Sequence, residues 1–194
     1  MTENSTTTDR RIAVVIGSTR PTRICPEIAG RVLKTAQQNS RLTYEPVDLA
    51  KVALPFLDEP RKPALGQYEH EHTRRWSRTA SGYDGFLFVL PQYNWGYPAV
   101  LKNALDFLYA EWRDKPAAVA SYGTRGGNRA VAQLRGALQG LHMRIIEQNL
   151  ELVVTDAHAD EDELTDVAPT LQPFTEQVRL VDAQLTELLT DDQQ

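Results

Sequence analysis

The sequence predicts an α/β fold in which a parallel sheet of five strands is covered by helices on both faces. Short apolar runs alternate with longer amphipathic stretches, which is the pattern of strands joined by crossover helices. The runs are apolar at most positions, as expected of strands buried on both faces. The 194 residues hold no internal repeat and no second-domain boundary, so one domain over residues 11–190 is expected.

Five apolar runs are predicted to be strands. The third, Asp84–Leu90 (DGFLFVL), is the most continuous and should be fully buried. Right-handed crossovers and the regular alternation of elements favour the order 2-1-3-4-5, which is that of a flavodoxin-like, doubly wound sheet. In chain order the strands are Ile12–Ile16, Leu42–Val47, Asp84–Leu90, Pro116–Ser121 and, as a strand or the approach to one, Arg144–Val154.

The amphipathic stretches between the runs are predicted to be helices. Pro26 suits a first helical turn, because its missing N–H is not needed there. Apolar residues from Val100 to Leu108 recur at helical spacing, whereas the Pro-rich segment Leu54–Gly66 should be mostly irregular. The expected helices are Pro26–Gln38, Tyr68–Ser81, Pro98–Trp112, Asn128–Leu141 and Leu171–Leu189, the last capped by Thr170 or Pro169.

Composition and charge narrow the class of protein. A formal net charge of −5 argues against nucleic-acid binding, which needs a concentrated basic face. No apolar run approaches the roughly 20 residues that span a bilayer, and the polar N-terminus has no apolar stretch of a secretory signal. The single cysteine, Cys25, cannot form an internal disulfide, which suits a reducing cytoplasm. We expect a cytoplasmic protein without nucleic-acid or membrane partners, with solvated tails at residues 1–10 and 191–194.

Three loops with unusual composition follow the first, third and fourth predicted strands. They are Gly17–Arg23 (GSTRPTR), Pro91–Pro98 (PQYNWGYP) and Ser121–Gly127 (SYGTRGG). In a doubly wound sheet, ligands bind beyond the carboxyl ends of the strands, where the strand order reverses. The convergence of these loops on one edge of the sheet therefore predicts a ligand site.

The first loop has the chemistry of a phosphate site. It carries the hydroxyl of Ser18 and the guanidinium groups of Arg20 and Arg23, and it runs into a helix N-terminus. The GxGxxG fingerprint is absent and no Gly-Lys-Ser/Thr follows, so a single terminal phosphate fits better than a pyrophosphate. The alternative is a surface loop whose hydroxyls cap the helix.

The second and third loops suit a flat heteroaromatic ring. Backbone N–H groups of Gln92, Tyr93 and Asn94 could line the polar edge of a ring, with Trp95 or Tyr97 against its faces. The alternative is an aromatic-rich turn or a subunit interface. The glycines of the third loop would let the main chain approach a ligand closely, or would make an ordinary strand-to-helix turn.

These motifs, in this order and spacing, resemble the NADPH-dependent FMN reductase family, which includes azo, chromate and quinone reductases. The resemblance runs from about Arg11 to Val154, and the stretch PQYNWGYPAVLKNALDFL resembles the quinone-reductase branch most closely. It implies bound FMN, reduction by NADPH or NADH, and a small acceptor such as a quinone, an azo compound or free flavin, with ping-pong kinetics. It implies no catalytic acid, base or nucleophile, since the flavin carries the hydride chemistry. It also implies a homodimer or homotetramer.

The resemblance implies a set of FMN-binding residues. Bulk at Ile24 and Cys25, where family members often have Gly or a small polar residue, could weaken phosphate binding, although the backbone donors would remain. Gln92 stands where many members have Glu. The implied residues are Ser18, Arg20, Arg23, Ile24 and Cys25 at the phosphate, Pro91, Gln92, Tyr93 and Asn94 along the ribityl chain and isoalloxazine, and Ser121, Tyr122, Gly123, Gly126 and Gly127 near the ring.

Several residues outside these motifs could suggest other chemistry. His70 and His72 point to different helix faces, so no metal site is expected. Asp48 should be a loop-capping or solvated carboxylate, Cys25 a packing residue rather than a reactive thiol, and the acidic run 160–163 a solvated loop. Trp76 and Trp112 should lie in the core or at an interface, and the Pro98 helix with Tyr109–Trp112 looks suited to subunit pairing.

Two other functions remain open at this point. A flavodoxin-type electron carrier would hold FMN without oxidising NAD(P)H, although the modest net charge and the basic first loop speak against a carrier's acidic docking face. A binding or regulatory module on the same scaffold is the third possibility, because a fold alone does not determine function.

Overall fold

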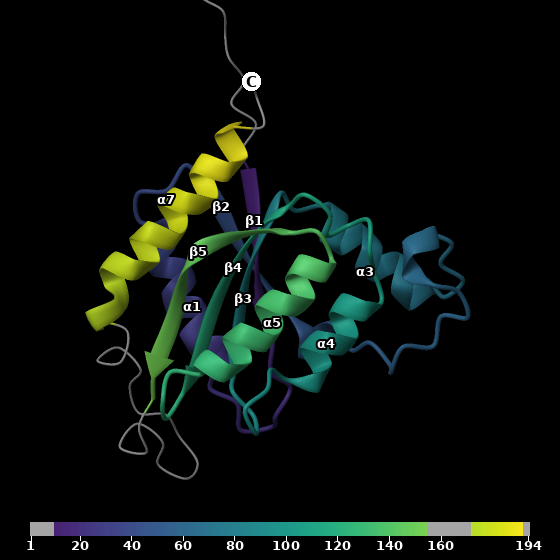
Figure 1. Cartoon of the computed structure of the whole chain (residues 1–194), viewed down its shortest axis with the longest axis horizontal. Coiled ribbons are helices and arrows are strands. Elements are labelled where there is room, and N and C mark those ends of the chain that lie inside the picture. Colours follow the sequence, from purple (N-terminus) through teal and green to yellow (C-terminus); the bar gives the residue numbers. More distant parts are fainter. Residues whose placement is uncertain (1–9, 155–171, 192–194) are drawn as a thin grey trace, which may run out of the picture.

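The computed structural model describes residues 10–154 and 172–191, and these form an α/β structure around one parallel sheet (Figure 1). The strand order is β2-β1-β3-β4-β5, and every neighbouring pair is parallel. This confirms the predicted flavodoxin-like order. The strands are β1 (Arg10–Ile16), β2 (Leu42–Asp48), β3 (Gly85–Pro91), β4 (Pro116–Gly123) and β5 (Arg144–Val153).

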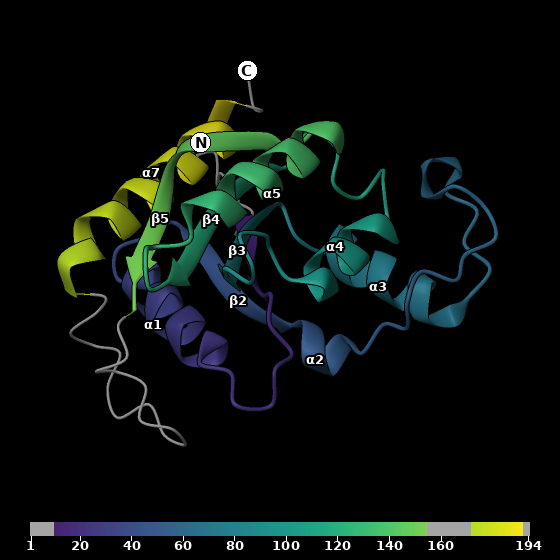
Figure 2. The same cartoon turned by 60° about the horizontal axis from the view of Figure 1, so that its bottom comes forward.

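Helices cover both faces of the sheet. Helices α1 and α7 pack on one face, and α3, α4 and α5 pack on the other (Figures 1 and 2). The helical elements are α1 (Cys25–Gln37), α2 (Leu49–Val52), η1 (Pro63–Leu65), α3 (Glu71–Ser81), α4 (Ala99–Asp106), α5 (Asn128–Gly140), η3 (Gln172–Phe174) and α7 (Thr175–Asp191). None of these helices is long and apolar enough to cross a membrane.

Two apolar layers sandwich the sheet, because alternate residues of a strand point to opposite faces. In β1, Ile12 and Val14 join the layer under α1 and α7, whereas Ala13 and Val15 join the layer under α3, α4 and α5. All seven residues of β3 are buried. The continuous apolar run predicted at residues 84–90 is thus the centre of the molecule.

The main difference from the predicted elements is the length of α4. The helix was expected to continue to Trp112, but it ends at Asp106 and the chain then makes turns. The Trp112 side chain folds back under the helix, and its indole N–H donates to the carbonyl oxygen of Leu105 (3.1 Å). The Trp76 indole N–H likewise donates to the carbonyl of Ala104 (2.9 Å). The two buried indole N–H groups are therefore hydrogen-bonded to carbonyl groups of the last turn of α4.

Residues 53–70, here called the arm, project from the body of the molecule between α2 and α3 (Figures 1 and 2). The arm is irregular apart from η1, as its proline content predicts. It is nevertheless hydrogen-bonded to the body: Asn103 accepts from the N–H of Leu57 (3.0 Å) and donates to the carbonyl of Pro55 (2.7 Å). Phe56 is 86% exposed.

Some predictions fall on residues that the structure does not describe. They are the acidic run 160–163, the caps at Pro169 and Thr170, and the two tails apart from Arg10 and Asp191. Arg10 begins β1, where its guanidinium pairs with Asp84 (2.7 Å), and Asp191 ends α7.

Candidate functional site

The three predicted loops meet at the carboxyl edge of the sheet. In Figure 1 they lie below the sheet, where β1, β3 and β4 end. The hydroxyl groups of Ser18 and Tyr93 share a hydrogen bond (2.9 Å), which joins the first loop to the second. The N–H of Gln92 donates to the carbonyl of Tyr122 (3.0 Å), which joins the second loop to the third. We call residues 17–23, 91–98 and 121–127 the three-loop cluster.

The first loop contains hydrogen-bond donors that have no partner among the described residues. The Ser18 side chain is completely buried, and Thr19 and Arg20 are exposed. The backbone N–H groups of Thr19, Arg20 and Thr22 have no hydrogen-bond partner among the described residues. No side chain caps the first turn of α1, so the alternative in which the loop hydroxyls cap this helix is wrong. Open donors at the positive end of a helix favour an anion.

The two arginines of the first loop have different environments. Arg23 makes a bidentate ion pair with the carboxylate of Asp48 (2.6 and 2.7 Å) and also donates to the carbonyl of Ser18 (2.5 Å). The pair holds the loop against the end of β2 and lowers the pKa of Asp48. Asp48 also caps α2 by accepting from the N–H of Ala50 (3.1 Å), as predicted, but its pairing with Arg23 could not be read from the sequence. Arg20 has no recorded ion pair with a described residue.

Cys25 lies in the core rather than at the surface. Its thiol donates to the carbonyl of Val89 (3.3 Å), and burial raises the pKa of the thiol to about 11. The neighbouring Tyr122 is also buried, and burial together with Cys25 raises the pKa of its phenol. A thiol with this pKa stays protonated at neutral pH, so the interpretation of Cys25 as a packing residue holds.

The second loop contains a tight turn with an unusual backbone. Tyr93 and Gly96 exchange two backbone hydrogen bonds of 2.9 Å, and the residues between them, Asn94 and Trp95, have φ of 46° and 70°. Asn tolerates this left-handed region, whereas Trp rarely adopts it. The N–H groups of Gln92 and Tyr93 donate to Tyr122 and Gly96, so of the three N–H groups expected at a ring edge only that of Asn94 lacks a recorded partner among the described residues.

The side chain of Gln92 connects the second loop to α5. Its carbonyl oxygen accepts from the backbone N–H groups of Arg129 (3.1 Å) and Ala130 (3.2 Å) in the first turn of that helix. Gln92 therefore caps α5 from a distant part of the chain, a role that its position in a motif does not reveal.

The glycines of the third loop have two different reasons to be glycine. Gly126 and Gly127 have φ of 76° and 82°, and a Cβ on Gly126 would lie 2.9 Å from the carbonyl oxygen of Glu151. The turn itself requires both. Gly123 has no such constraint: the nearest atom to an added Cβ would be Cβ of Gln92 at 3.8 Å. Its missing side chain leaves space at the edge of the cluster, where a ligand could approach the main chain.

One contact at the cluster could not have been predicted from the sequence. The Arg129 guanidinium lies over the ring of Trp95, 4.4 Å from the ring centroid. A possible signal was the sequence Asn94-Trp95 at a turn that usually takes Asn-Gly, but nothing in the pattern points to Arg129.

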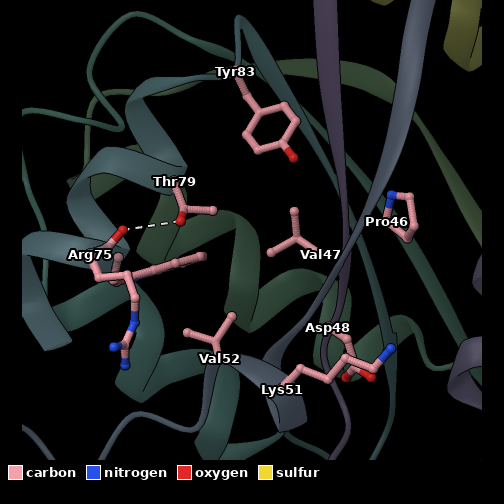
Figure 3. A pocket seen from close by; sticks show the side chains of 9 residues that line it. Pro46, Val47, Asp48, Lys51, Val52, Arg75, Thr79 and Tyr83 are labelled. Carbon is pink, nitrogen blue, oxygen red and sulfur yellow. Dashed lines mark hydrogen bonds between the residues drawn. The ribbon is translucent and has the colours of Figure 1, made fainter.

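A separate hollow of about 340 Å³ lies at the edge of the sheet between β2, α2 and α3 (Figure 3). Val47 and Trp76 are its buried lining residues, and Lys51 and Arg75 are exposed. Asp48 links it to the first loop through Arg23. Its lining residues lie outside the three-loop cluster, so this hollow is not the predicted ligand site. Among the described residues no cluster of His, Cys, Asp and Glu could hold a metal ion.

The fold and these contacts define a flavodoxin-like protein whose loops present open hydrogen-bond donors at the carboxyl edge of the sheet, and comparisons with known proteins identify its family. The model of the NADPH-dependent FMN reductase family matches residues 10–159. An NAD(P)H-dependent FMN reductase of Schizosaccharomyces pombe is 46% identical over 137 residues, covering 70% of this chain and 68% of that protein. A 2-hydroxy-1,4-benzoquinone reductase of a Burkholderia species is 30% identical over 145 residues, covering 71% and 75%.

A solved structure is similar over nearly the whole chain. The flavoenzyme NAD(P)H:(acceptor) oxidoreductase FerB of Paracoccus denitrificans has a TM-score of 0.71 and 23% identity, covering 92% of this chain and 98% of that one. This likeness supports the fold. From the family model and the sequence relatives, the chain belongs to the NADPH-dependent FMN reductase family. It is an oxidoreductase that works with FMN and NAD(P)H, as the loop motifs implied.

Proposed function

We propose that the three-loop cluster holds FMN and that the chain passes electrons from NAD(P)H through it to a quinone or another small acceptor. The observation that carries the proposal is the meeting of three distant loops around buried Ser18, with the uncapped N-terminus of α1 beside it. A quinone is the favoured acceptor, because a relative that matches over most of its length is a 2-hydroxy-1,4-benzoquinone reductase.

The phosphate of FMN would bind at the first loop. The donors would be the Ser18 hydroxyl, the open N–H groups of the loop and the Arg20 guanidinium. Arg23 would not bind the phosphate directly but would hold the loop in place through its ion pair with Asp48. Cys25 is buried in the core and Ile24 packs against it. We infer that their bulk leaves the N–H donors clear, in keeping with the expectation that the backbone donors would remain.

The ring system would lie along the second and third loops. The open N–H of Asn94 and the space beside Gly123 suit the ring and its ribityl chain. Pro91, Gln92 and Tyr93 keep these groups in place, because Gln92 bonds both Tyr122 and α5. The remaining residues of the proposed site shape the third loop: Ser121, which donates to the carbonyl of Gly126 (2.6 Å), Tyr122, Gly126 and Gly127.

FMN, when bound, accepts a hydride from NAD(P)H and returns two electrons to an acceptor. The protein's part is to orient the ring and to offer N–H donors where negative charge develops. We propose ping-pong turnover, in which NAD(P)⁺ leaves before the acceptor enters, without a catalytic acid, base or nucleophile from the chain.

Absorbance spectroscopy tests the function directly. Purified protein loaded with FMN should lose its flavin absorbance when NADPH is added without air, and the colour should return when a quinone follows. Free FMN with NADPH but no protein is the control. Protein that binds FMN but stays coloured with NADPH and with NADH would be an electron carrier, and protein that takes up no FMN would be a module of another kind.

The chain is proposed to work in the cytoplasm as a homodimer or homotetramer. The expected interface around Tyr109–Trp112 needs a correction, because Trp112 is buried in the core against Trp76 and Phe86. The arm is the better candidate surface. It holds Phe56, Leu57 and Leu65 exposed on a hydrogen-bonded segment, where they contribute little to the chain's own core.

A further inference from the structure

Trp95 and Arg129 form a stacked pair at the edge of the three-loop cluster. The Trp95 ring is 61% exposed although it occupies a backbone conformation that disfavours it. Arg129 lies over the ring at 4.4 Å, and the Gln92 side chain binds the N–H of the same Arg129. A strained backbone conformation of this kind clusters at functional sites, where the surrounding structure holds it in place.

The charges around the pair are not neutralised within the chain. Arg20, Arg125 and Arg129 have no recorded ion pair or side-chain hydrogen bond with a described residue, whereas Arg10, Arg11 and Arg23 each bind a carboxylate. The overall charge of the chain is −5, yet these three guanidinium groups of the three-loop cluster and the start of α5 have no carboxylate partner among the described residues. If Arg20 binds the FMN phosphate, Arg125 and Arg129 still carry free charge.

We propose that Trp95 and Arg129 form a subsite for the electron acceptor and favour planar aromatic acceptors that carry an anionic group. The Trp95 ring offers a flat apolar surface, and the Arg129 guanidinium offers N–H donors and a charge that no carboxylate of the described residues neutralises. Stacking with an aromatic ring and bonding to a carboxylate or sulfonate are interactions that arginine makes together more readily than lysine. The inference rests on the proposed function, because it specifies the acceptor of the same site.

The acceptor's charge can be varied without changing its ring. We would compare menadione bearing a carboxyethyl chain with the methyl ester of the same compound, using FMN-loaded protein and saturating NADPH. In ping-pong turnover the kcat/KM of an acceptor reports only its own half-reaction, so effects on NADPH do not enter. Arg129→Ala should lower kcat/KM for the carboxylate by about tenfold and for the ester by less than about twofold. Arg129→Lys should recover only part of the loss.

A second readout does not depend on turnover. Calorimetric titration of the oxidised, FMN-loaded protein with the carboxylate should show a dissociation constant that rises about tenfold in Arg129→Ala, with a smaller rise in Trp95→Phe. Arg113→Ala is the matched control, because Arg113 lies over another aromatic ring, that of Tyr109, outside the cluster (5.7 Å). It should change neither measurement.

The possible outcomes distinguish a failure of the acceptor-subsite proposal from a failure of the proposed oxidoreductase function. Equal losses for acid and ester in Arg129→Ala, or no loss for either, would overturn the subsite while leaving the oxidoreductase intact. If the wild-type protein reduces neither quinone, the proposed acceptor class is wrong, and the calorimetric comparison still decides whether Arg129 selects an anion.

Discussion

At the scale of single residues, the buried hydroxyl of Ser18 is the most informative feature of the first loop. A buried polar group needs a hydrogen-bond partner, and in this structure that partner is the phenol of Tyr93 (2.9 Å). The open N–H groups beside it are arranged for an acceptor that the chain does not supply. An FMN phosphate would supply one.

Ser18→Ala should therefore weaken FMN binding. A hydrogen bond to a charged group contributes about 1.5–3 kcal/mol, so the dissociation constant should rise roughly 10–100-fold. Titration of apoprotein followed by the quenching of flavin fluorescence measures it. Ser81→Ala, at the exposed end of α3, is the control and should bind like the wild type. Unchanged affinity in Ser18→Ala would place the phosphate elsewhere.

Trp95 illustrates a residue whose position costs stability. A left-handed backbone costs about 1–2 kcal/mol for residues other than Gly, Asn and Asp. Replacing Trp95 by glycine would remove this strain, but the greater conformational entropy of glycine in the unfolded chain offsets part of the stability gained. Trp95→Gly should leave the free energy of unfolding within about 1 kcal/mol of wild type. Trp112→Ala, which removes a buried indole, should lower it by about 3–5 kcal/mol. Urea denaturation compares the two, and a similar large loss in both would show that Trp95 is structural.

At the scale of secondary-structure elements, the cluster is kept together by side chains that connect elements far apart in the sequence. Arg23 and Asp48 join the first loop to the end of β2, and Gln92 joins the second loop to the start of α5. The first contact neutralises two largely buried charges, which would be costly to leave unpaired. The second supplies a hydrogen-bond acceptor to N–H groups at the start of a helix, which have no partner within the helix.

Asp48→Asn should make stability less dependent on pH. Asparagine can still cap α2, but Arg23 loses its counter-charge, which should lower the free energy of unfolding by about 1–3 kcal/mol at neutral pH. Arg23 lowers the pKa of Asp48, so the wild-type pair is fully stabilising above the ordinary carboxyl value of 3.8 and is lost as pH falls through the lower folded value. Denaturation curves of both proteins should converge below that value. A constant difference across this range would contradict the assignment.

Gln92 provides a test of the cap on α5. Gln92→Ala removes the acceptor and should cost about 0.5–2 kcal/mol. Gln92→Glu keeps an acceptor and adds negative charge at a helix N-terminus, so it should equal or exceed wild-type stability by about 0.3–1 kcal/mol. Thermal melting of the apoproteins compares the three. A glutamate variant less stable than the alanine variant would rule out capping.

At the scale of the whole molecule, the arm exposes apolar side chains that the packing of a single chain does not account for. It is fixed to the body by Asn103 and by the Asp58–His72 contact (2.9 Å), yet it presents apolar side chains to solvent. Exposed apolar groups on an ordered segment are typical of interfaces.

Polar substitutions in the arm should therefore separate subunits without unfolding them. The double variant Phe56→Ser and Leu65→Ser should change the monomer's own stability by less than about 0.5 kcal/mol, since both side chains are exposed. Light scattering should show a dimer or tetramer for the wild type and a smaller species for the variant. Leu180→Ser, on the exposed side of α7, is the control and should assemble normally. A monomeric wild type would refute the assembly.

The sequence predicted the sheet and most elements to within a few residues, because each depends on local apolar periodicity. Its errors occur where distant side chains decide. α4 ends at Asp106 and Trp112 folds back against it, and Trp112 could not be assigned to the core or to an interface without knowing what packs around it. The three loops were predicted to meet at one edge of the sheet and they do, but the sequence did not show which of their backbone donors are bonded within the chain.

The order of strands, the positions of the three loops and the family followed from the chain alone, because strand polarity places the ends of β1, β3 and β4 at one edge. Only the tertiary structure decided which charges are free: it pairs Arg23 with Asp48, leaves Arg20 without a recorded partner among the described residues, and sets Arg129 over Trp95. These partners are between 25 and 34 residues apart in sequence and belong to different elements. Spacing in a sequence carries no information on such contacts, since the packing of the whole fold determines them.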